Sequence, residues 1–451
     1  MLAAGFIALL SFGSLITFTM PSMRGFGLAT AFGILASLIM EMTLIPALRS
    51  LLPPPTDNQT ARERSKAVFD PILSGLASMI KNGQERWILL IAGGVLLVCT
   101  VGAFRIDVNN SMDAQFFASS DIIQSFHEVS KRTAGPFVLQ VLVDTKREDG
   151  VKDPTILLRM DQLQAFVQKQ PRAAAVGHVV SVVDFLKLMN RRMNGDVAAQ
   201  EVLPDTPDKI GQYLLLYSFS GEKSDLDRFV DFTYRKASMM INLQTDDARI
   251  IGGFIDRLRS ESARLFAGTD ARVEVGGGVA YLIALNETIV RGKVVNLIQI
   301  AAIILVITSL LLRSFLGGFL VMIPLFCSVV INFGLMGWAG IWFSMGTAAI
   351  SAMAAGIGAD YAIYFLFRVR EEARQSHDVR QAAARTLTTS GKAIASVAIA
   401  IGAGYLCLAA SGFELHFLLG LLVALMMISS CLGALALLPA LLVKIRPRFL
   451  E

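Results

Sequence analysis

The sequence predicts a polytopic α-helical membrane protein with one α/β domain inserted between its helices. Hydrophobic residues make up 54% of the 451 positions and charged residues 17%, which is less charge than a soluble domain of this size carries. Apolar runs long enough to cross a bilayer recur along the chain, and one long polar segment interrupts them. We therefore expect a membrane protein whose polar segment folds as a separate domain.

About eight apolar runs qualify as membrane spans. They lie at about 1–20, 24–49, 87–105, 292–313, 315–338, 344–367, 391–411 and 415–443. If the chain starts in the cytoplasm, the basic clusters fall on the inner side and the opposite loops carry few charges, as the positive-inside rule requires. This orientation predicts a multi-pass protein of the bacterial inner membrane, with both ends of the chain cytoplasmic and the polar segment periplasmic.

The same pattern divides the chain into successive parts. Residues 1–52 hold two transmembrane helices, 53–86 a cytoplasmic linker that begins with a triproline, and 87–105 a third transmembrane helix. Residues 106–290 form the outer domain, 291–445 a bundle of five transmembrane helices, and 446–451 a cytoplasmic tail.

The outer domain alternates between strand-like and helix-like stretches. The stretches at 136–143, 176–183, 238–243 and 272–275 are typical of strands, whereas 154–169 and 247–265 are typical of helices. A strand-helix-strand pattern made twice predicts a compact α/β domain with one sheet. The triglycine at 276–278 then joins the last strand to the next span.

The first two spans repeat the last two. Phe12, Gly27 and the motif Leu-Ile-Pro-Ala-Leu at 44–48 recur as Tyr405, Gly420 and Leu-Leu-Pro-Ala-Leu at 437–441, at a constant offset of 393 residues. Parallel repeats of this kind are familiar in secondary transporters. Because no basic leader precedes the first apolar run, we expect Met1 to be internal to a longer gene; the alternative is an uncleaved anchor in a true half-size protein.

One carboxylate interrupts an otherwise apolar span. Asp360 lies eight residues before Arg368, which marks the cytoplasmic edge, so it sits about 12 Å inside the bilayer. An ionised carboxylate at that depth costs at least about 2.5 to 3.5 kcal/mol, unless it is protonated, paired or hydrated. A buried carboxyl that can bind and release a proton is the kind of group that a proton-driven transporter requires. The alternative is a structural hydrogen bond to a neighbouring helix.

Other residues could support a proton relay at Asp360. Tyr361 and Tyr364 supply hydroxyls nearby, and Tyr364 lies on the same helix face one turn later. Asn332 and Ser351 could also contribute, although interhelical hydrogen bonds would explain both. The glycines beside the carboxylate would let another helix approach closely; they are Gly356 and Gly358.

Nothing in the sequence predicts an enzyme, a metal site or a cofactor. All four cysteines lie inside apolar runs, and no Ser-His-Asp, Cys-His or metal-ligating constellation stands out. The net charge of +5 does not indicate nucleic-acid binding, because the basic residues flank apolar runs instead of forming a stripe interleaved with aromatic residues.

Several motifs together resemble the resistance-nodulation-division superfamily, and within it the exporters of the mycobacterial-membrane-protein-large (MMPL) type. The span Gly356-x-Gly-x-Asp-Tyr361 is followed by the basic exit at 368–372 and an amphipathic stretch from Val379 to Ser390. The repeated Pro-Ala-Leu endings and the start of the outer domain, from Asp107 to Gly135, fit the same branch.

The resemblance implies a proton-driven exporter built from two similar halves. Asp360 and Tyr361 would be the proton-relay pair of the second half, 106–290 would be a porter-like domain, and the cargo would be a membrane lipid or another amphiphile. Only one Asp-Tyr span is present, so the resemblance also implies a partner, either a missing N-terminal half or a second copy. The rival hypotheses are a non-pumping, lipid-binding scaffold of the sterol-sensing type and an accessory subunit of protein translocation.

Overall fold

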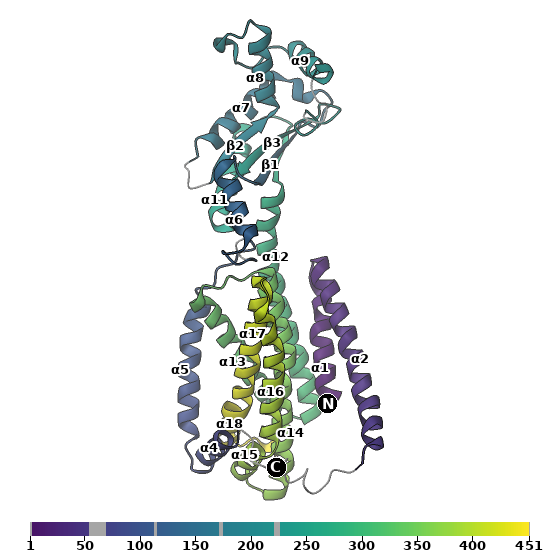
Figure 1. Ribbon diagram of the computed structural model, residues 1–451, viewed down its shortest axis with the longest axis vertical. Helices are drawn as coiled ribbons and strands as arrows, with labels where there is room; N and C mark the ends of the chain where they lie inside the picture. The colour runs from purple at the N-terminus through teal and green to yellow at the C-terminus, as the bar shows by residue number, and fades with distance from the viewer. Residues whose placement is uncertain (1, 54–68, 112–114, 171–174, 221–225, 451) are drawn as a thin grey trace. The chain divides into compact units, whose positions relative to one another are not determined.

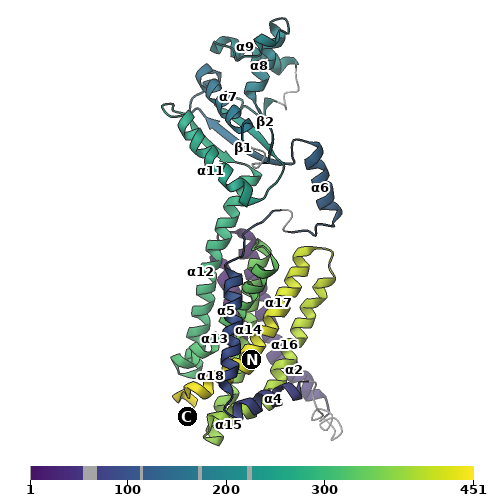
Figure 2. The same ribbon diagram turned by 90° about the vertical axis from the view of Figure 1, so that its left-hand side faces the viewer.

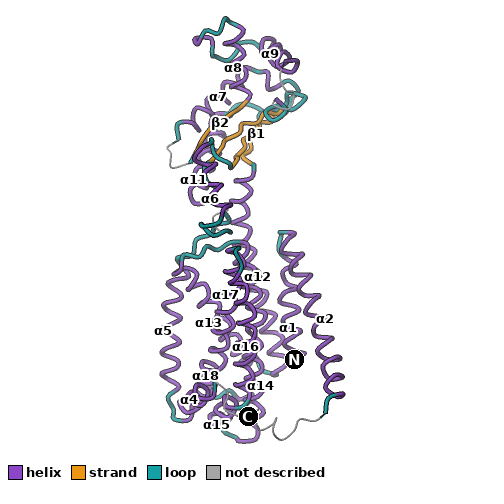
Figure 3. Tube along the Cα trace, in the orientation of Figure 1, coloured by secondary structure: helices purple, strands orange, loops and turns teal. Residues whose placement is uncertain are grey.

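The computed structural model describes residues 2–53, 69–111, 115–170, 175–220 and 226–450, without the side chains of 2–4, 220, 345 and 349–357. The chain divides into two compact units. One comprises Met1–Val108 and Thr288–Glu451, and the other comprises Asn109–Glu287. All the strands lie in the second unit (Figure 3).

The first unit is a bundle of long apolar helices that run alongside one another (Figures 1 and 2). Within the described residues, six helical segments are long and apolar enough to cross a membrane. They are α2 (Pro21–Leu51), α5 (Glu85–Ala103), α12 (Gly278–Leu312), α13 (Phe315–Ala339), α16 with the turn η6 (Ser390–Leu406 and Cys407–Ala410), and α17 continuing into α18 (Glu414–Leu432 and Leu438–Ile445). The two other predicted spans correspond to α1 (Leu2–Gly13) with η1 (Ser14–Thr17), and to α14 (Met345–Ser376).

The internal repeat is visible in the boundaries of the helices. The turn η1 and the turn η6 are both 3₁₀ helices, they lie 393 residues apart, and α2 and α17 begin at the same offset. The contacts repeat as well. A Cβ added at Gly27 would lie 2.5 Å from the Leu15 Cβ and 2.8 Å from the Phe12 carbonyl, and one added at Gly420 would lie 2.5 Å from the Tyr405 carbonyl. In each copy the glycine lets the second helix pack on the turn that precedes it.

The two copies differ at one place. The segment Gly433–Leu437 between α17 and α18 is a π-helix, whereas α2 continues as a regular α-helix through the corresponding residues. A Cβ at Gly433 would lie 3.0 Å from the Cβ of Pro324 in α13. Such π-segments interrupt α-helices mostly as single turns and are frequent at functional sites.

The helices α5 and α13 approach each other without a layer of side chains between them. A Cβ at Gly334 would collide with the backbone of Cys99, and one at Gly337 would collide with the carbonyl of Gly102. The indole Nε1 of Trp338 donates to the Val98 carbonyl at 3.1 Å across the same contact. Small residues at such crossings allow the close approach that stabilises helix pairs in membranes.

Part of the predicted linker 53–86 is helical. The helix α4 (Asp70–Lys81) buries Leu73, Ala77 and Ile80 and packs on α15 (Val379–Thr388). Arg380 of α15 forms a bidentate ion pair with Glu85 and donates to the Ile80 carbonyl at 2.6 Å. The prediction missed α4 because its short amphipathic pattern is weaker than the signals of the triproline and the charges before it.

The second unit contains one four-stranded sheet with the order β2-β3-β1-β4. The strands are β1 (Phe137–Asp144), β2 (Val176–Ser181), β3 (Lys236–Leu243) and β4 (Arg272–Gly276), and all neighbouring pairs are antiparallel. The helix α7 (Pro154–Gln168) connects β1 to β2, and α11 (Ala248–Leu265) connects β3 to β4. Each connection spans an intervening strand, which is the split βαβ arrangement.

The predicted strand at 176–183 ends earlier than expected. Val182 and Val183 begin α8 (Val182–Met193) instead of extending β2. A capping box causes this change, because the Ser181 hydroxyl accepts from the Val183 amide while Asp184 accepts from the Ser181 amide at 2.8 Å. The described part of this unit also contains the α-helices α6 (Asp121–Arg132) and α9 (Pro207–Ser220), neither of which was predicted, and the short 3₁₀ helices η3 (Gly150–Lys152) and η5 (Ala198–Gln200).

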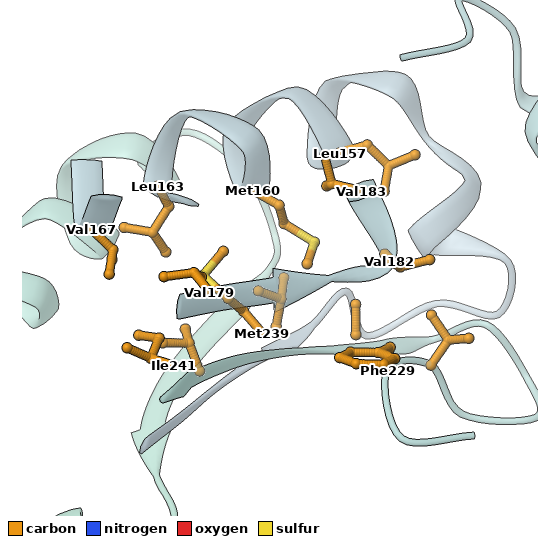
Figure 4. Packing of buried hydrophobic residues seen from close by; sticks show 14 of the residues in the cluster. Leu157, Met160, Leu163, Val167, Val179, Val182, Val183, Phe229, Met239 and Ile241 are labelled. Atoms are coloured by element: carbon orange, nitrogen blue, oxygen red, sulfur yellow. The ribbon is translucent and has the colours of Figure 1, made fainter. Parts of the chain in front are cut away.

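The core of the second unit lies between the sheet and its helices. Along β1 and β3 alternate side chains are buried, as in a sheet covered on one face. In Figure 4 the residues Leu157, Met160 and Leu163 of α7 point toward Val179, Met239 and Ile241 of the sheet. Burying such aliphatic side chains contributes about 1.5 to 3 kcal/mol each.

Candidate functional site in the helical unit

The candidate site is built on α14. Its first turn is closed by a capping box in which the Ser344 backbone amide donates to the Thr347 hydroxyl at 2.8 Å and the Thr347 amide donates back to the Ser344 hydroxyl. The helix packs on α1, α13, α16 and α17, so its middle is enclosed by the bundle. Asp360 lies in this part of the helix.

One oxygen of the Asp360 carboxylate lacks a hydrogen-bond partner in the described part of the chain. This atom, Oδ1, is buried. Buried polar atoms without partners are rare in folded proteins, and each demands an explanation. Protonation, or water that enters the bundle, would account for this one.

Two side chains of α17 hold α14 on either side of Asp360. The Ser430 hydroxyl donates to the Gly358 carbonyl at 2.7 Å, and the Tyr361 hydroxyl donates to the Met427 sulfur at 3.5 Å. A Cβ at Gly358 would lie only 2.9 Å from the Ser430 oxygen, so a side chain at this position would crowd the contact. The carboxylate is thus next to a polar contact between helices that a change of charge would disturb.

The other predicted residues lie in different surroundings. Asn332 of α13 donates to the Leu422 carbonyl at 2.8 Å and to the Met426 sulfur, so the contacts it makes are interhelical. Tyr364 follows one turn after Asp360 and is 39% exposed. The side chain of Ser351 and the surroundings of Gly356 lie outside the described part of the structure.

Sequence reasoning missed Ser430. A serine in the run Ile428–Leu432 is a common packing residue, and its partner Gly358 is 72 residues away. Only the adjacent pair Ser429 and Ser430, in a span that is otherwise apolar, could have pointed to it.

Sequence reasoning also missed a second buried polar cluster, where α12 meets the end of α1. Lys293 is 3% exposed, and its amino group has no partner among the described residues. One turn later Asn296 donates to the Ser14 hydroxyl at 2.9 Å. A lysine within an apolar run was the available signal, but its place at the edge of the predicted span made it resemble a flanking charge.

An apolar cavity of about 500 Å³ lies within the bundle. Side chains from α4, α5, α13 and α17 line it, among them Met79, Val95, Ile331 and Leu425. Among the described residues no group of three or more His, Cys, Asp or Glu side chains could hold a metal ion.

Comparisons with known proteins agree with the sequence resemblance. The model of the MMPL family matches residues 1–74 and 152–448. The membrane protein MJ1562 of Methanocaldococcus jannaschii is 21% identical over 80% of this chain and 91% of its own length. Among solved structures, the hedgehog release protein Disp from the water bear Hypsibius dujardini has a TM-score of 0.62 at 13% identity, covering 99% of this chain and 58% of that chain.

Proteins named MmpL11 are similar over shorter shares of their own length. The mycolic acid-containing lipids exporter of Mycolicibacterium smegmatis is 27% identical over 42% of this chain and 21% of its own length. The heme uptake protein of Mycobacterium tuberculosis is 23% identical over 91% of this chain and 39% of its own length. This chain thus spans less than half the length of either mycobacterial relative. The family match covers most of the chain, and the protein therefore belongs to the MMPL family of the resistance-nodulation-division superfamily.

Proposed function

We propose that this chain is part of a proton-driven exporter of lipids or other hydrophobic and amphiphilic molecules in a bacterial inner membrane. The observation that carries the proposal is the unpartnered buried oxygen of Asp360 in a helix enclosed by the bundle. Acids inside membrane bundles are costly and usually belong to ion or proton pathways.

The proton would act by changing the packing of α14 against α17. A neutral carboxyl can remain in a dry contact, whereas an ionised one demands water or a counter-charge. The two forms therefore favour different separations at the Gly358–Ser430 and Tyr361–Met427 contacts. In this mechanism Asp360 and Tyr361 form the relay, with Tyr364, Asn332 and Ser351 as supporting groups, and the proton gradient biases a rocking motion between the repeats.

Two observations support an amphiphilic cargo. The cavity between α4, α5, α13 and α17 is lined by apolar side chains and is large enough for part of an acyl chain. One relative is named an exporter of mycolic acid-containing lipids, although another of the same name is a heme uptake protein. The α/β unit Asn109–Glu287 would be the periplasmic, porter-like domain that receives the cargo.

Transport would require a partner. The described chain has one Asp-Tyr span, and its α1–α2 hairpin repeats only the last hairpin of the bundle. We infer that this hairpin is the end of a first repeat, completed by an N-terminal half or by a second copy of the chain.

The test is the substitution Asp360→Asn, made in the complete assembly and reconstituted in vesicles with a pH-sensitive dye inside. We expect loss of proton-coupled lipid export with normal expression and thermal stability, because asparagine fits the same space but cannot carry the proton. The matched control is Asp205→Asn, which makes the same chemical change at an exposed position of the second unit.

If Asp360→Asn exports lipid at the wild-type rate, the proton-driven mechanism is wrong. Bound lipid together with no proton flux in the wild-type protein would instead favour the non-pumping scaffold. Co-purification with a secretion channel, without movement of lipid, would favour the accessory role in protein translocation.

A further inference from the structure

A second cavity lies at the end of the bundle where α12 meets α13. It has a volume of about 740 Å³ and lies beside the last turns of α14. The residues that line it include Arg313, Tyr364, Phe367, Arg370, Glu371 and Arg374. The cavity is therefore lined by both basic and aromatic side chains.

Four arginines line this cavity, and only Arg368 forms ion pairs with acids among the described residues. Glu371, the acid in its lining, is engaged by Arg368 at 2.6 Å. For Arg313, Arg370 and Arg374 the described residues offer no carboxylate within ion-pair distance, and the Nε atom of Arg370 is buried without an acceptor. The cavity therefore has an excess of positive charge.

These arginines also act on one another. Arg370 and Arg374 are one turn apart on α14, a spacing at which like charges destabilise a helix. Arg313 ends α12 in the left-handed region, with a φ of 50°. Arg370 lies in the last turns of α14, beyond the predicted span. Burial lowers its pKa, and the positive charges of Arg374 and Arg313 lower it further.

The positive charge expected at the cytoplasmic end of a membrane bundle does not by itself require three arginines to line one cavity. The positive-inside rule is satisfied by cations in any part of a loop. Arg385, for example, belongs to the same basic end but lies exposed on α15, outside the lining of the cavity.

We propose that this cavity binds a phosphate-type anion, held by the guanidinium groups of Arg313, Arg370 and Arg374. Guanidinium groups match phosphate oxygens in geometry and charge, and basic pockets between transmembrane helices suit lipid headgroups. Apolar side chains in the same lining also accommodate a lipid, because Phe367 is 37% exposed and Leu311 is 40% exposed. The anion can come from a phospholipid headgroup or from free phosphate.

The experiment measures retained lipid by native mass spectrometry. The full-length protein is equilibrated in mixed micelles that contain equal amounts of phosphatidylglycerol and phosphatidylcholine. We expect the wild type to retain phosphatidylglycerol selectively and the double variant Arg370→Gln/Arg374→Gln to lose at least ten-fold of that selectivity. The matched control Arg385→Gln removes one charge from the same end of the bundle, and it should retain the wild-type selectivity.

A second arm distinguishes the source of the anion. Inorganic phosphate and dioctanoyl phosphatidylglycerol are each titrated against the thermal stability of the wild type, and only the lipid should raise the melting temperature at millimolar concentration. An equal rise with inorganic phosphate that the double variant abolishes supports the same site with free phosphate as its ligand. Equal losses of selectivity in Arg385→Gln and the double variant would overturn the proposal, and so would a wild type that shows neither lipid selectivity nor stabilisation by inorganic phosphate. If the double variant unfolds, Arg313→Gln in the turn before α13 repeats the test.

Discussion

At the scale of single residues, one ion pair of the α/β unit joins two neighbouring strands. Arg235 binds both oxygens of Asp144, at 2.8 and 2.9 Å, and so joins the end of β1 to the start of β3. The hydrogen bonds from Arg235 lower the pKa of Asp144 to about 2, well below the roughly 3.9 of an unfolded chain. This bidentate geometry supplies two well-aligned, charge-assisted hydrogen bonds, which most surface ion pairs lack.

This pKa predicts how the stability of the unit depends on pH. Because the folded pKa is the lower one, the contribution of Asp144 is present above about pH 4 and disappears as the pH falls toward 2. The variant Asp144→Asn should therefore unfold at a lower temperature than the wild type at pH 7, and the difference should shrink between pH 4 and pH 2. Melting curves of the full chain in detergent measure this. A difference independent of pH would mean that the ion pair does not stabilise the unit.

At the same scale, the sequence points to Asp360 as a candidate but not to the side chains that α17 places beside it. A charged residue in an apolar run stands out from composition alone, because the cost of burying it is large whatever the fold. Ser430 and Met427 could not be found in this way. They meet α14 only after α17 has packed on it, and helix packing depends on shapes that are distant in sequence.

At the scale of elements, the close packing in the repeated hairpin predicts that a methyl group added at Gly420 destabilises the protein. Gly420→Ala would place a Cβ 2.5 Å from the Tyr405 carbonyl and 3.1 Å from the Leu408 Cβ. We expect a loss of about 1 to 3 kcal/mol, the usual cost of overpacking, measured as a lower melting temperature in detergent.

The control for this prediction lies in the same hairpin. Gly404 in α16 has nothing within 4 Å of an added Cβ, so Gly404→Ala should be neutral or slightly stabilising. Gly27→Ala should behave like Gly420→Ala, since its surroundings are the same. Equal melting temperatures for Gly420→Ala and Gly404→Ala would contradict the close contact.

The strands were predicted accurately because buried and exposed side chains alternate clearly along them. Each of the four strands was predicted at nearly its observed place, because strands of a sheet with one buried face alternate clearly. The helices α4, α6, α8 and α9 were missed because they are short and partly polar. Their formation depends on helix caps and on tertiary packing, which cannot be predicted from the hydrophobic periodicity of the sequence.

At the scale of the whole molecule, the proposed topology makes a prediction about access. In a Cys407→Ser background, which removes the exposed cysteine, a new cysteine is introduced at Val197 in the α/β unit or at Arg385 on α15. A membrane-impermeant maleimide, applied to cells whose outer membrane is permeable, should label Val197→Cys at once. Arg385→Cys should react only after the inner membrane is opened. Labelling of both positions from the same side would refute the proposed topology.

Hydropathy changes abruptly near residues 106 and 290 of the sequence. The compact unit Asn109–Glu287 begins and ends within three residues of these positions, whereas the finer division of the chain stays a prediction. The start of α12 could not be predicted from the sequence. This helix begins at Gly278, and its first four turns are too mixed in polarity to join an apolar run.

The contact between α5 and α13 limits how the bundle can deform. Gly102 on one helix meets Gly334 and Gly337 on the other with backbone against backbone, so sliding either helix by one residue would drive a side chain into a peptide group. No rotamer change can relieve such a collision. The two helices are therefore expected to move as one rigid body in any rearrangement of the bundle.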